Sequence, residues 1–363
     1  MRAALLTGLL CLGACAPKTY PVARTIDGVR EVGTFVSPFA YEHFVRAELA
    51  AGERDAEAVE LYELARAGAQ DDAYVASRQA EAEIRLGQLD AAERTLAEAE
   101  ALEPDTEELW LATAELRLAR EDADGAMNAL VRAARLDPTS PTPVLRIAER
   151  LARDGAAQRA LEELAEGPQD HPAVLRAQLS LALEQGDARR AATAAEKLAA
   201  RVPLVVGELV QAGRAALEAG RPALASRLLA GPALDREPGV PALRARTLLA
   251  LGEREAAEAL VLATAPDALG GRGEAARLLL AIGHTEMARD MAAVGRSNAE
   301  PASEEALGRA LLELEGPGPA AAAFAGARDV DEPGSGAREG LAEAAEASGR
   351  AALAAEIAGH PAP

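Results

Sequence analysis

The chain has 363 residues, of which 49% are hydrophobic and only 2% aromatic, and its formal net charge is −20. This hydrophobic content excludes general disorder, and the negative charge disfavours binding to nucleic acid phosphates. Abundant alanine, leucine, glutamate and arginine, with few β-branched runs, favour an all-α fold whose core uses small and straight-chain side chains.

Residues 1–14 have the layout of a secretory signal peptide, with one arginine, an apolar run at 3–12 and then small residues. The run is too short for a permanent transmembrane helix, which needs about 20 residues. The sequence Leu12-Gly13-Ala14-Cys15 resembles the bacterial lipobox. That resemblance implies cleavage before Cys15 and its lipidation. The alternative is an ordinary cleaved signal with a chance cysteine.

The cysteine content agrees with a lipid anchor. The two cysteines are Cys11, inside the signal, and Cys15, so the mature protein would have no free thiol. One acyl chain anchors only marginally, whereas two or three on one cysteine hold a protein firmly on a membrane. Ala16 would follow the lipidated cysteine. By resemblance to enterobacterial lipoproteins, this residue implies the outer membrane, with the protein facing the periplasm.

Residues 15–37 are interpreted as the lipidated cysteine and a tether, because the segment has no sustained helical period and holds several prolines. A short strand at 30–36 is compatible with these residues but is not required. A folded body is expected over 38–359, followed by a short tail at 360–363.

A regular period of about 34 residues appears in the folded body. Pro104, Pro138 and Pro172 are evenly spaced at this period. Three further columns keep the same step and register: Ala92, Ala126 and Ala160; Leu96, Leu130 and Leu164; Ala80, Ala114 and Ala148.

This chain resembles the tetratricopeptide repeat (TPR) family, whose unit is a pair of helices with this period. The resemblance implies an all-α, right-handed superhelical α-solenoid of about ten helical hairpins. The physical logic agrees with it. Small residues allow close helix approach, glycine ends the first helix in the left-handed conformation, and proline stops the second.

Turn positions extend the array in both directions. They are Gly52, Gly87, Glu121, Gly155, Gly186, Gly220, Gly252, Gly283, Gly316 and Gly349, with alanine partners at Ala191, Ala225, Ala257, Ala288, Ala320 and Ala354. Glu121 stands where the family has glycine. Segment 314–324 matches least, and disorder is the alternative there. A break in the array is compatible with 200–207 or 230–241.

No catalytic constellation is found. The four histidines are widely separated, and no zinc-peptidase, phosphate-loop or nucleophile-elbow motif occurs. We therefore expect no enzyme activity, no cofactor and no metal.

The resemblance implies instead that the first helix of each hairpin lines a concave groove that grips a partner. The candidate groove residues are Tyr74, Ser77, Arg78, Glu81, Arg85, Glu108, Leu111, Glu115, Thr142, Leu145, Glu149 and Arg153. Glu81, Glu115 and Glu149 recur at the repeat period and form a candidate acidic ladder. The alternative is that Glu81–Arg85 and Glu149–Arg153 are helix-stabilising i,i+4 pairs. No cluster of basic groove residues is evident.

The first hairpin gathers aromatic residues. Phe35, Phe39, Tyr41, Phe44 and Tyr62 all lie in this part of the chain. They are expected to close the end of the array as a cap. The alternative is an exposed docking patch.

Together these features predict a non-enzymatic, lipid-anchored scaffold of the cell envelope that binds a protein partner through the groove and assists assembly of an outer-membrane, secretion or pilus complex. The alternative function is an accessory protein that binds envelope polysaccharide or peptidoglycan. Neither prediction involves nucleic acid.

Overall fold

The computed structural model describes residues 21–359, apart from 27–28, 35–36, 69–71, 236 and 301. The predicted signal peptide, Cys15, Phe35 and the tail at 360–363 lie outside the described residues. The chain divides into two compact units, Met1–Ala156 and Ala157–Pro363. Both segments in which the sequence allowed a break, 200–207 and 230–241, lie inside the second unit.

The described part of the first unit begins with an antiparallel β-hairpin. Strand β1 (Pro21–Ile26) pairs with β2 (Val29–Thr34), with Pro21 opposite Thr34 and Ile26 opposite Val29. Both strands lie in the segment interpreted from the sequence as a tether. A signal for the hairpin was present, because the Asp-Gly dipeptide at 27–28 separates two short alternating segments.

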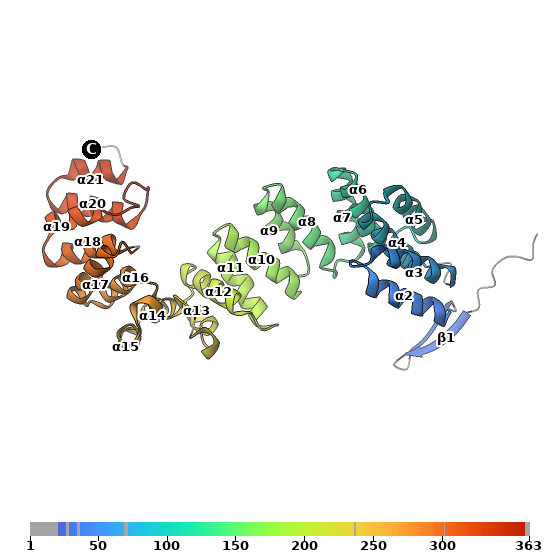
Figure 1. Cartoon of the computed structure of the whole chain (residues 1–363), viewed down its shortest axis with the longest axis horizontal. Coiled ribbons are helices and arrows are strands. Elements are labelled where there is room, and N and C mark those ends of the chain that lie inside the picture. The colour runs from blue at the N-terminus through green and yellow to red at the C-terminus, as the bar shows by residue number, and fades with distance from the viewer. Residues whose placement is uncertain are drawn as a thin grey trace, which may run out of the picture. The chain divides into compact units, whose positions relative to one another are not determined.

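All other regular structure in the described residues is helical (Figure 1). The helices of the first unit are α2 (Pro38–Ala50), α3 (Asp55–Gly68), α4 (Ala73–Arg85), α5 (Leu89–Leu102), α6 (Glu107–Ala119), α7 (Ala123–Leu136) and α8 (Thr142–Arg153).

The second unit contains α9 to α21 and two short 3₁₀ helices. Their bounds are α9 (Ala157–Glu166), α10 (Pro172–Glu184), α11 (Ala188–Ala199), α12 (Val206–Glu218), α13 (Pro222–Leu228), η1 (Pro232–Leu234), α14 (Val240–Ala250), α15 (Arg254–Ala263), η2 (Pro266–Leu269), α16 (Arg272–Ile282), α17 (Thr285–Ser297), α18 (Ser303–Leu314), α19 (Pro317–Phe324), α20 (Gly336–Ala347) and α21 (Ala351–Ala358).

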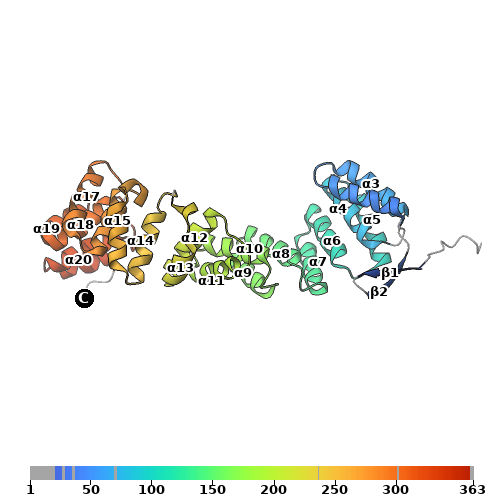
Figure 2. The ribbon, with the colours of Figure 1, turned by 90° about the horizontal axis from the view of Figure 1, so that it is seen from below.

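Within each unit successive helices pack in pairs, from α2 with α3 to α6 with α7 and from α10 with α11 to α20 with α21, which confirms the predicted all-α array of TPR-like units. Helices α8 and α9 follow one another in the sequence but lie in different units. We call the first members A helices (α2, α4 and the even-numbered helices to α20) and the second members B helices. Figure 2 shows the paired helices within each unit from a second direction. In the described residues no helix is both long and apolar enough to span a bilayer.

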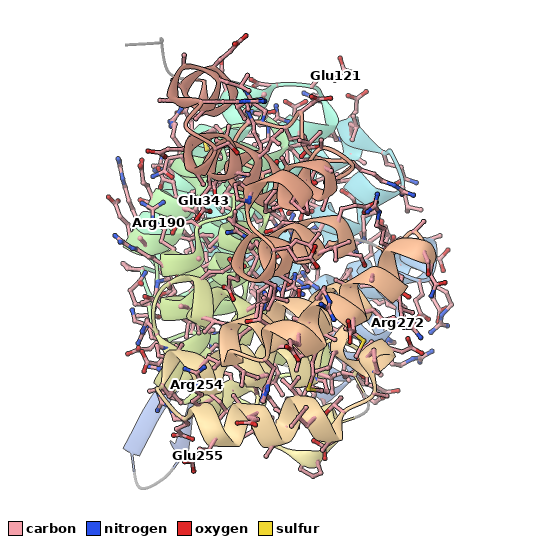
Figure 3. The ribbon with its side chains drawn as sticks, turned by 90° about the vertical axis from the view of Figure 1, so that its left-hand side faces the viewer. Glu121, Arg190, Arg254, Glu255, Arg272 and Glu343 are labelled. Carbon is pink, nitrogen blue, oxygen red and sulfur yellow. The ribbon has the colours of Figure 1, made fainter. Side chains whose placement is uncertain are left out.

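All ten predicted turn positions adopt a left-handed backbone. The nine glycines have φ between 68° and 95°. Glu121, at the end of α6, has φ 62° although it carries a side chain (Figure 3). The helix-ending geometry is therefore set by the repeat, and a non-glycine residue is held in it at an energetic cost.

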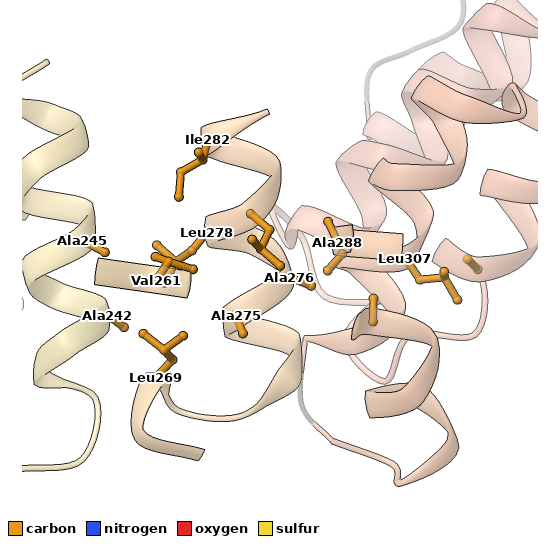
Figure 4. Packing of buried hydrophobic residues seen from close by; sticks show 14 residues of the cluster. Ala242, Ala245, Val261, Leu269, Ala275, Ala276, Leu278, Ile282, Ala288 and Leu307 are labelled. Carbon is orange, nitrogen blue, oxygen red and sulfur yellow. The ribbon is translucent and has the colours of Figure 1, made fainter. Parts of the chain in front are cut away.

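The repeat columns form the core. Ala92, Ala126 and Ala160 are at most 1% exposed, and the leucine column Leu96, Leu130 and Leu164 at most 5%. Small side chains at these positions bring the two helices of a hairpin together. In the second unit Leu269, Leu278 and Ile282 are packed among alanines from neighbouring helices (Figure 4).

Segment 314–324, which matches the repeat least, contains α19, and this helix packs against α18. Helix α19 ends with Phe324, which is fully buried. A Cβ atom added to Gly308 of α18 would lie 2.6 Å from the Phe324 ring, and one added to Gly340 of α20 would collide with the same ring. The extra glycines therefore make room for an aromatic side chain between two A helices.

Candidate protein-binding groove

The predicted groove residues lie on three A helices of the first unit, α4, α6 and α8. Apart from Ser77, all of them are at least partly exposed. Helices α4 and α6 are in direct contact, and an ion pair joins α6 to α8. The three helices therefore form one surface, which we call the A-helix face.

The prediction for Ser77 is wrong. Ser77 is fully buried, and its hydroxyl donates a hydrogen bond to the Ala73 carbonyl at 2.9 Å. A serine that bonds to its own helix in this way can be buried without an unsatisfied polar group. Ser77 is part of the core of α4 and does not line a groove.

At the N-terminal end of this face, α2 and α4 are joined by a charged hydrogen-bond network. Arg78 donates to both carboxylate oxygens of Glu48, at 2.9 and 3.0 Å. The Tyr62 hydroxyl donates to the same carboxylate at 2.5 Å. Burial of Glu48 opposes its ionisation, but the hydrogen bonds from Arg78 and Tyr62 outweigh it and lower the pKa of Glu48.

Glu81 lies further along α4, and its side chain is only 12% exposed. Burial raises the pKa of Glu81 to about 7, and the nearby Glu115 carboxylate adds to this effect. Arg78, which is hydrogen-bonded to Glu81, together with Arg85 and Arg146, acts in the opposite direction without overcoming burial. A carboxyl group that titrates near neutral pH therefore lies on the A-helix face.

Of the two i,i+4 pairs weighed from the sequence, only one forms. Arg153 donates to Glu149 at 2.8 Å. Arg85 is bonded instead to Asp55 of α3, at 2.9 Å. The expected Glu81–Arg85 pair is wrong, because Asp55 at the start of the preceding hairpin's B helix lies within reach of Arg85.

The second acid of the predicted ladder, Glu115, bonds with a residue that the sequence did not single out. Arg146 of α8 lies 2.7 Å from Glu115 of α6. Each acid of the ladder thus has an arginine partner: Arg78 for Glu81, Arg146 for Glu115 and Arg153 for Glu149. The A-helix face is a mixed-charge surface rather than an acidic one.

A pocket opens on this face between α6, α7 and α8. Its apolar part comes from α6 and α7, and its charged wall comes from α8. The lining residues are Leu111, Ala114, Glu115, Leu118, Ala123, Ala126, Met127, Leu130, Arg146, Glu149, Arg150 and Arg153. Four predicted groove residues, Leu111, Glu115, Glu149 and Arg153, therefore meet at one pocket.

The structure also corrects the expectation that the groove has no basic cluster. Arg146, Arg150 and Arg153 have the spacing i, i+4, i+7, which places them on one side of α8, and all three line the pocket. This spacing is visible in the sequence and could have identified the cluster. The other residues predicted on α8, Thr142 and Leu145, are partly exposed but are not among the pocket residues.

Two further predicted residues, Tyr74 and Glu108, lie in the first turns of α4 and α6. Tyr74 of α4 is 42% exposed, and its ring contacts Phe44 edge-on, with 5.9 Å between centroids. Burial raises the pKa of Tyr74, and the carboxylates of Glu48 and Glu108 add to it. Glu108 therefore lies near Tyr74, across the α4–α6 contact.

The aromatic residues of the first hairpin divide between the two roles considered from the sequence. Tyr62 is fully buried, and Phe44 packs on the same cluster, as a cap requires. Phe39 and Tyr41, however, are 72% and 66% exposed. The cap is therefore confirmed for Tyr62 and Phe44 only.

Ion pairs between successive A helices recur in the second unit. Arg176 of α10 pairs with Glu208 of α12 at 2.6 Å. Further pairs of this kind are Arg246–Glu274, Arg277–Glu305 and Arg309–Glu343. These pairs connect successive A helices of the second unit, so these charged side chains have partners within the chain.

Trp110, the single tryptophan of the chain, lies on a different side of α6 from the pocket. The Arg132 guanidinium stands 4.0 Å from the ring centroid, and the indole N–H donates to the Pro104 carbonyl at 3.3 Å. Trp110 therefore connects the proline loop to α6.

In the described part of the chain, no group of three or more His, Cys, Asp or Glu residues is placed to hold a metal ion.

Comparison with known proteins gives a likeness in fold. No family model matches the chain, and no curated protein matches it. Among solved structures, a tetratricopeptide repeat protein from Parabacteroides merdae covers 66% of this chain and 98% of its own, with 16% identity and a TM-score of 0.43.

The C-terminal part of a TPR repeat-containing protein from Cytophaga hutchinsonii covers 82% of this chain and 99% of its own, with 13% identity and a TM-score of 0.39. Both likenesses concern the helical fold alone.

Proposed function

We propose that this protein is a non-enzymatic scaffold that binds a segment of a protein partner on its A-helix face. The observation that supports this most is the pocket between α6, α7 and α8, where Leu111 and Met127 offer apolar surface beside the charged wall of α8. Apolar surface bordered by a few oriented polar groups is typical of a recognition site. A chemical reaction would require a catalytic constellation, and the sequence supplies none.

We further propose that the scaffold is held on the cell envelope by lipid on Cys15, on the periplasmic side of the outer membrane, and assists assembly of an outer-membrane, secretion or pilus complex. The signal layout at residues 1–14 and the lipobox-like sequence before Cys15 support the anchor. The alternative of an envelope polysaccharide ligand has less support. Carbohydrate sites favour open aromatic faces, and Arg132 covers one face of Trp110.

The anchor is tested by fractionation of cells that express the full chain. Cys15→Ala is expected to move the protein from the membrane to the soluble periplasmic fraction. Cys11→Ala is the matched control, because Cys11 lies inside the predicted signal, and it should leave the protein on the membrane. Membrane retention of the Cys15→Ala protein would contradict the lipid anchor.

The binding face is tested by co-purification from the native envelope. Leu111→Arg places a charge on the apolar part of the pocket and is expected to remove the bound partner. Leu102→Arg is the control, because Leu102 is 41% exposed on the B helix α5 and does not line the pocket. Circular dichroism confirms that each variant is folded. Equal partner recovery with both variants would contradict the proposed face.

A further inference from the structure

Helix α2, the first helix of the array, carries an apolar surface on its exposed side (Figure 1). Leu49, Phe39 and Tyr41 are 73%, 72% and 66% exposed, and they are the three most exposed large hydrophobic side chains in the described part of the chain. Val45 is also exposed, and its spacing of four residues from both Tyr41 and Leu49 places these three side chains in one row along the helix. We call Phe39, Tyr41, Val45 and Leu49 the outer face of α2.

The opposite side of α2 is apolar as well. Ala40, Ala47 and Ala50 are buried, and Phe44 packs against the core of the first hairpin. A helix that is hydrophobic all round is normally covered on all sides. Among the described elements α3 is the main packing partner of α2, whereas α4 packs against α3, α5 and α6. In the described residues the outer face of α2 therefore lacks the cover that its composition requires.

The charge on the exposed side of α2 is balanced. The exposed charged residues of this helix are Glu42 and Arg46, and the guanidinium lies 3.9 Å from the carboxylate. The whole chain has a net charge of −20, so two copies repel one another, and the chain also repels an anionic surface. A neutral apolar face on an acidic protein is therefore better suited to a zwitterionic lipid surface than to a second copy.

The β-hairpin before α2 keeps this helix near the proposed lipid anchor. Cys15 and Pro38 are 23 residues apart, a stretch that could extend to about 80 Å. Strands β1 and β2 occupy most of this stretch, and the pairing of Pro21 with Thr34 returns the chain to its starting point. The chain on either side of the hairpin, together with the width of the hairpin, spans at most about 40 Å. The hairpin therefore halves the distance that α2 can move from a lipidated Cys15.

We infer that the outer face of α2 rests on the lipid surface that holds the anchor, with Phe39, Tyr41 and Leu49 inserted among zwitterionic headgroups. Aromatic side chains favour the membrane–water interface, and a helix that buries an apolar face there lies in the plane of the surface. With 13 residues, α2 is too short to span a bilayer. The acyl chains supply the affinity, and the outer face of α2 determines which side of the first hairpin lies toward the membrane.

This inference rests on the proposed lipid anchor, and it names the surface that the first hairpin contacts. In the test, the full chain is purified from cell membranes and reconstituted into vesicles of phosphatidylcholine and phosphatidylethanolamine. Leu49→Cys carries a fluorophore, and Leu102→Cys, an exposed position on the B helix α5, carries the same fluorophore as the matched control. A lipidated Cys15 leaves the mature parent protein without a reactive thiol, so the parent should take up no label.

Brominated lipid chains quench a fluorophore at short range. We expect them to remove most of the fluorescence at position 49 and almost none at position 102. Phe39→Asp with Tyr41→Asp should return the label at position 49 to water, because charged side chains oppose insertion, whereas Leu102→Asp with Leu136→Asp on the B helices should leave it quenched. Raised salt should not change the quenching, since an apolar contact is not screened.

The other outcomes separate this inference from the anchor. If the parent stays on the vesicles but lipid quenches neither label, the inference is wrong and the anchor stands. Shielding of position 49 that grows with protein concentration, without quenching by lipid, would assign the face to a second copy and overturn the inference. If the parent takes up label at Cys15 and does not remain on the vesicles, both the anchor and the inference are wrong.

Discussion

The guanidinium of Arg146 lies 2.7 Å from the carboxylate of Glu115 and joins α8 to α6 across the candidate pocket. The two residues belong to successive A helices, and equivalent pairs join A helices in the second unit. One pair therefore both aligns neighbouring repeats and presents charge where a partner is proposed to bind.

The energy of this pair can be isolated with a double-mutant cycle of Glu115→Gln and Arg146→Gln. Because Arg146 is 45% exposed, the coupling energy should be modest, about 0.5–1 kcal/mol in the free energy of unfolding. Urea denaturation of the four proteins measures it. A coupling energy indistinguishable from zero would mean that the contact does not help hold α6 and α8 together.

Glu121 provides a test of backbone strain. Its φ of 62° is a conformation that glycine adopts without cost. Glu121→Gly is therefore expected to raise the free energy of unfolding by about 1 kcal/mol, seen as a higher urea midpoint at an unchanged slope.

The reciprocal change at the next turn position is the control for Glu121. Gly155 has φ 77°, and a Cβ added there would meet no atom within 4 Å. Gly155→Glu should therefore lower stability by a similar amount, through backbone conformation alone. If both substitutions shift stability in the same direction, the assignment of strain to this turn is wrong.

Glu81 should give the folded protein a pH-dependent stability. Its carboxyl group ionises near 4.5 in the unfolded chain and near 7 in the folded protein. Below about pH 4.5 both states are protonated. As pH rises to about 7 the unfolded state ionises first, so stability is lost, by at most on the order of 3 kcal/mol.

Glu81→Gln removes this titration. Relative to the parent protein, the variant should gain stability between pH 5 and pH 8 (on the order of 1–3 kcal/mol), because the parent must ionise a buried carboxyl group. Urea denaturation at both pH values tests it. A stability difference that does not change with pH would show that Glu81 ionises normally in the folded protein.

The Phe324 contact predicts which glycine substitutions the second unit tolerates. Gly340→Ala would press a methyl group into the Phe324 ring and should cost about 1–3 kcal/mol. Gly318→Ala, in α19 itself, meets no atom within 4 Å and should be neutral or slightly stabilising. Thermal denaturation compares the two, and equal effects would contradict the packing role of Gly340.

The repeat was predictable because its signal is periodic. Ala126, Leu130 and the turn residue Glu121 occupy positions fixed by the repeat period, and the structure gives each the burial or backbone angle expected for that position. Burial in the core and the backbone angle at the turn are both set within one repeat. They do not depend on the identity of a side-chain partner in another hairpin.

The side-chain partners were less predictable. Arg85 bonds to Asp55 and Arg146 to Glu115, and in each pair the two residues belong to different hairpins. Such pairs depend on how neighbouring hairpins are rotated, which a pattern within one helix does not specify. Ser77 was misplaced for a related reason, because α4 is packed on several sides and buries a polar position.

The central claim is that a protein segment lies on the A-helix face, and site-specific photo-cross-linking in living cells tests it most directly. A photoreactive residue would replace Leu111, Leu145 or Glu149 on this face, and Leu102 or Arg135 on B helices of the same unit. The account predicts a cross-linked polypeptide at the A-helix positions alone. Cross-links of equal yield at the B-helix positions, or an adduct that contains only glycan, would contradict it.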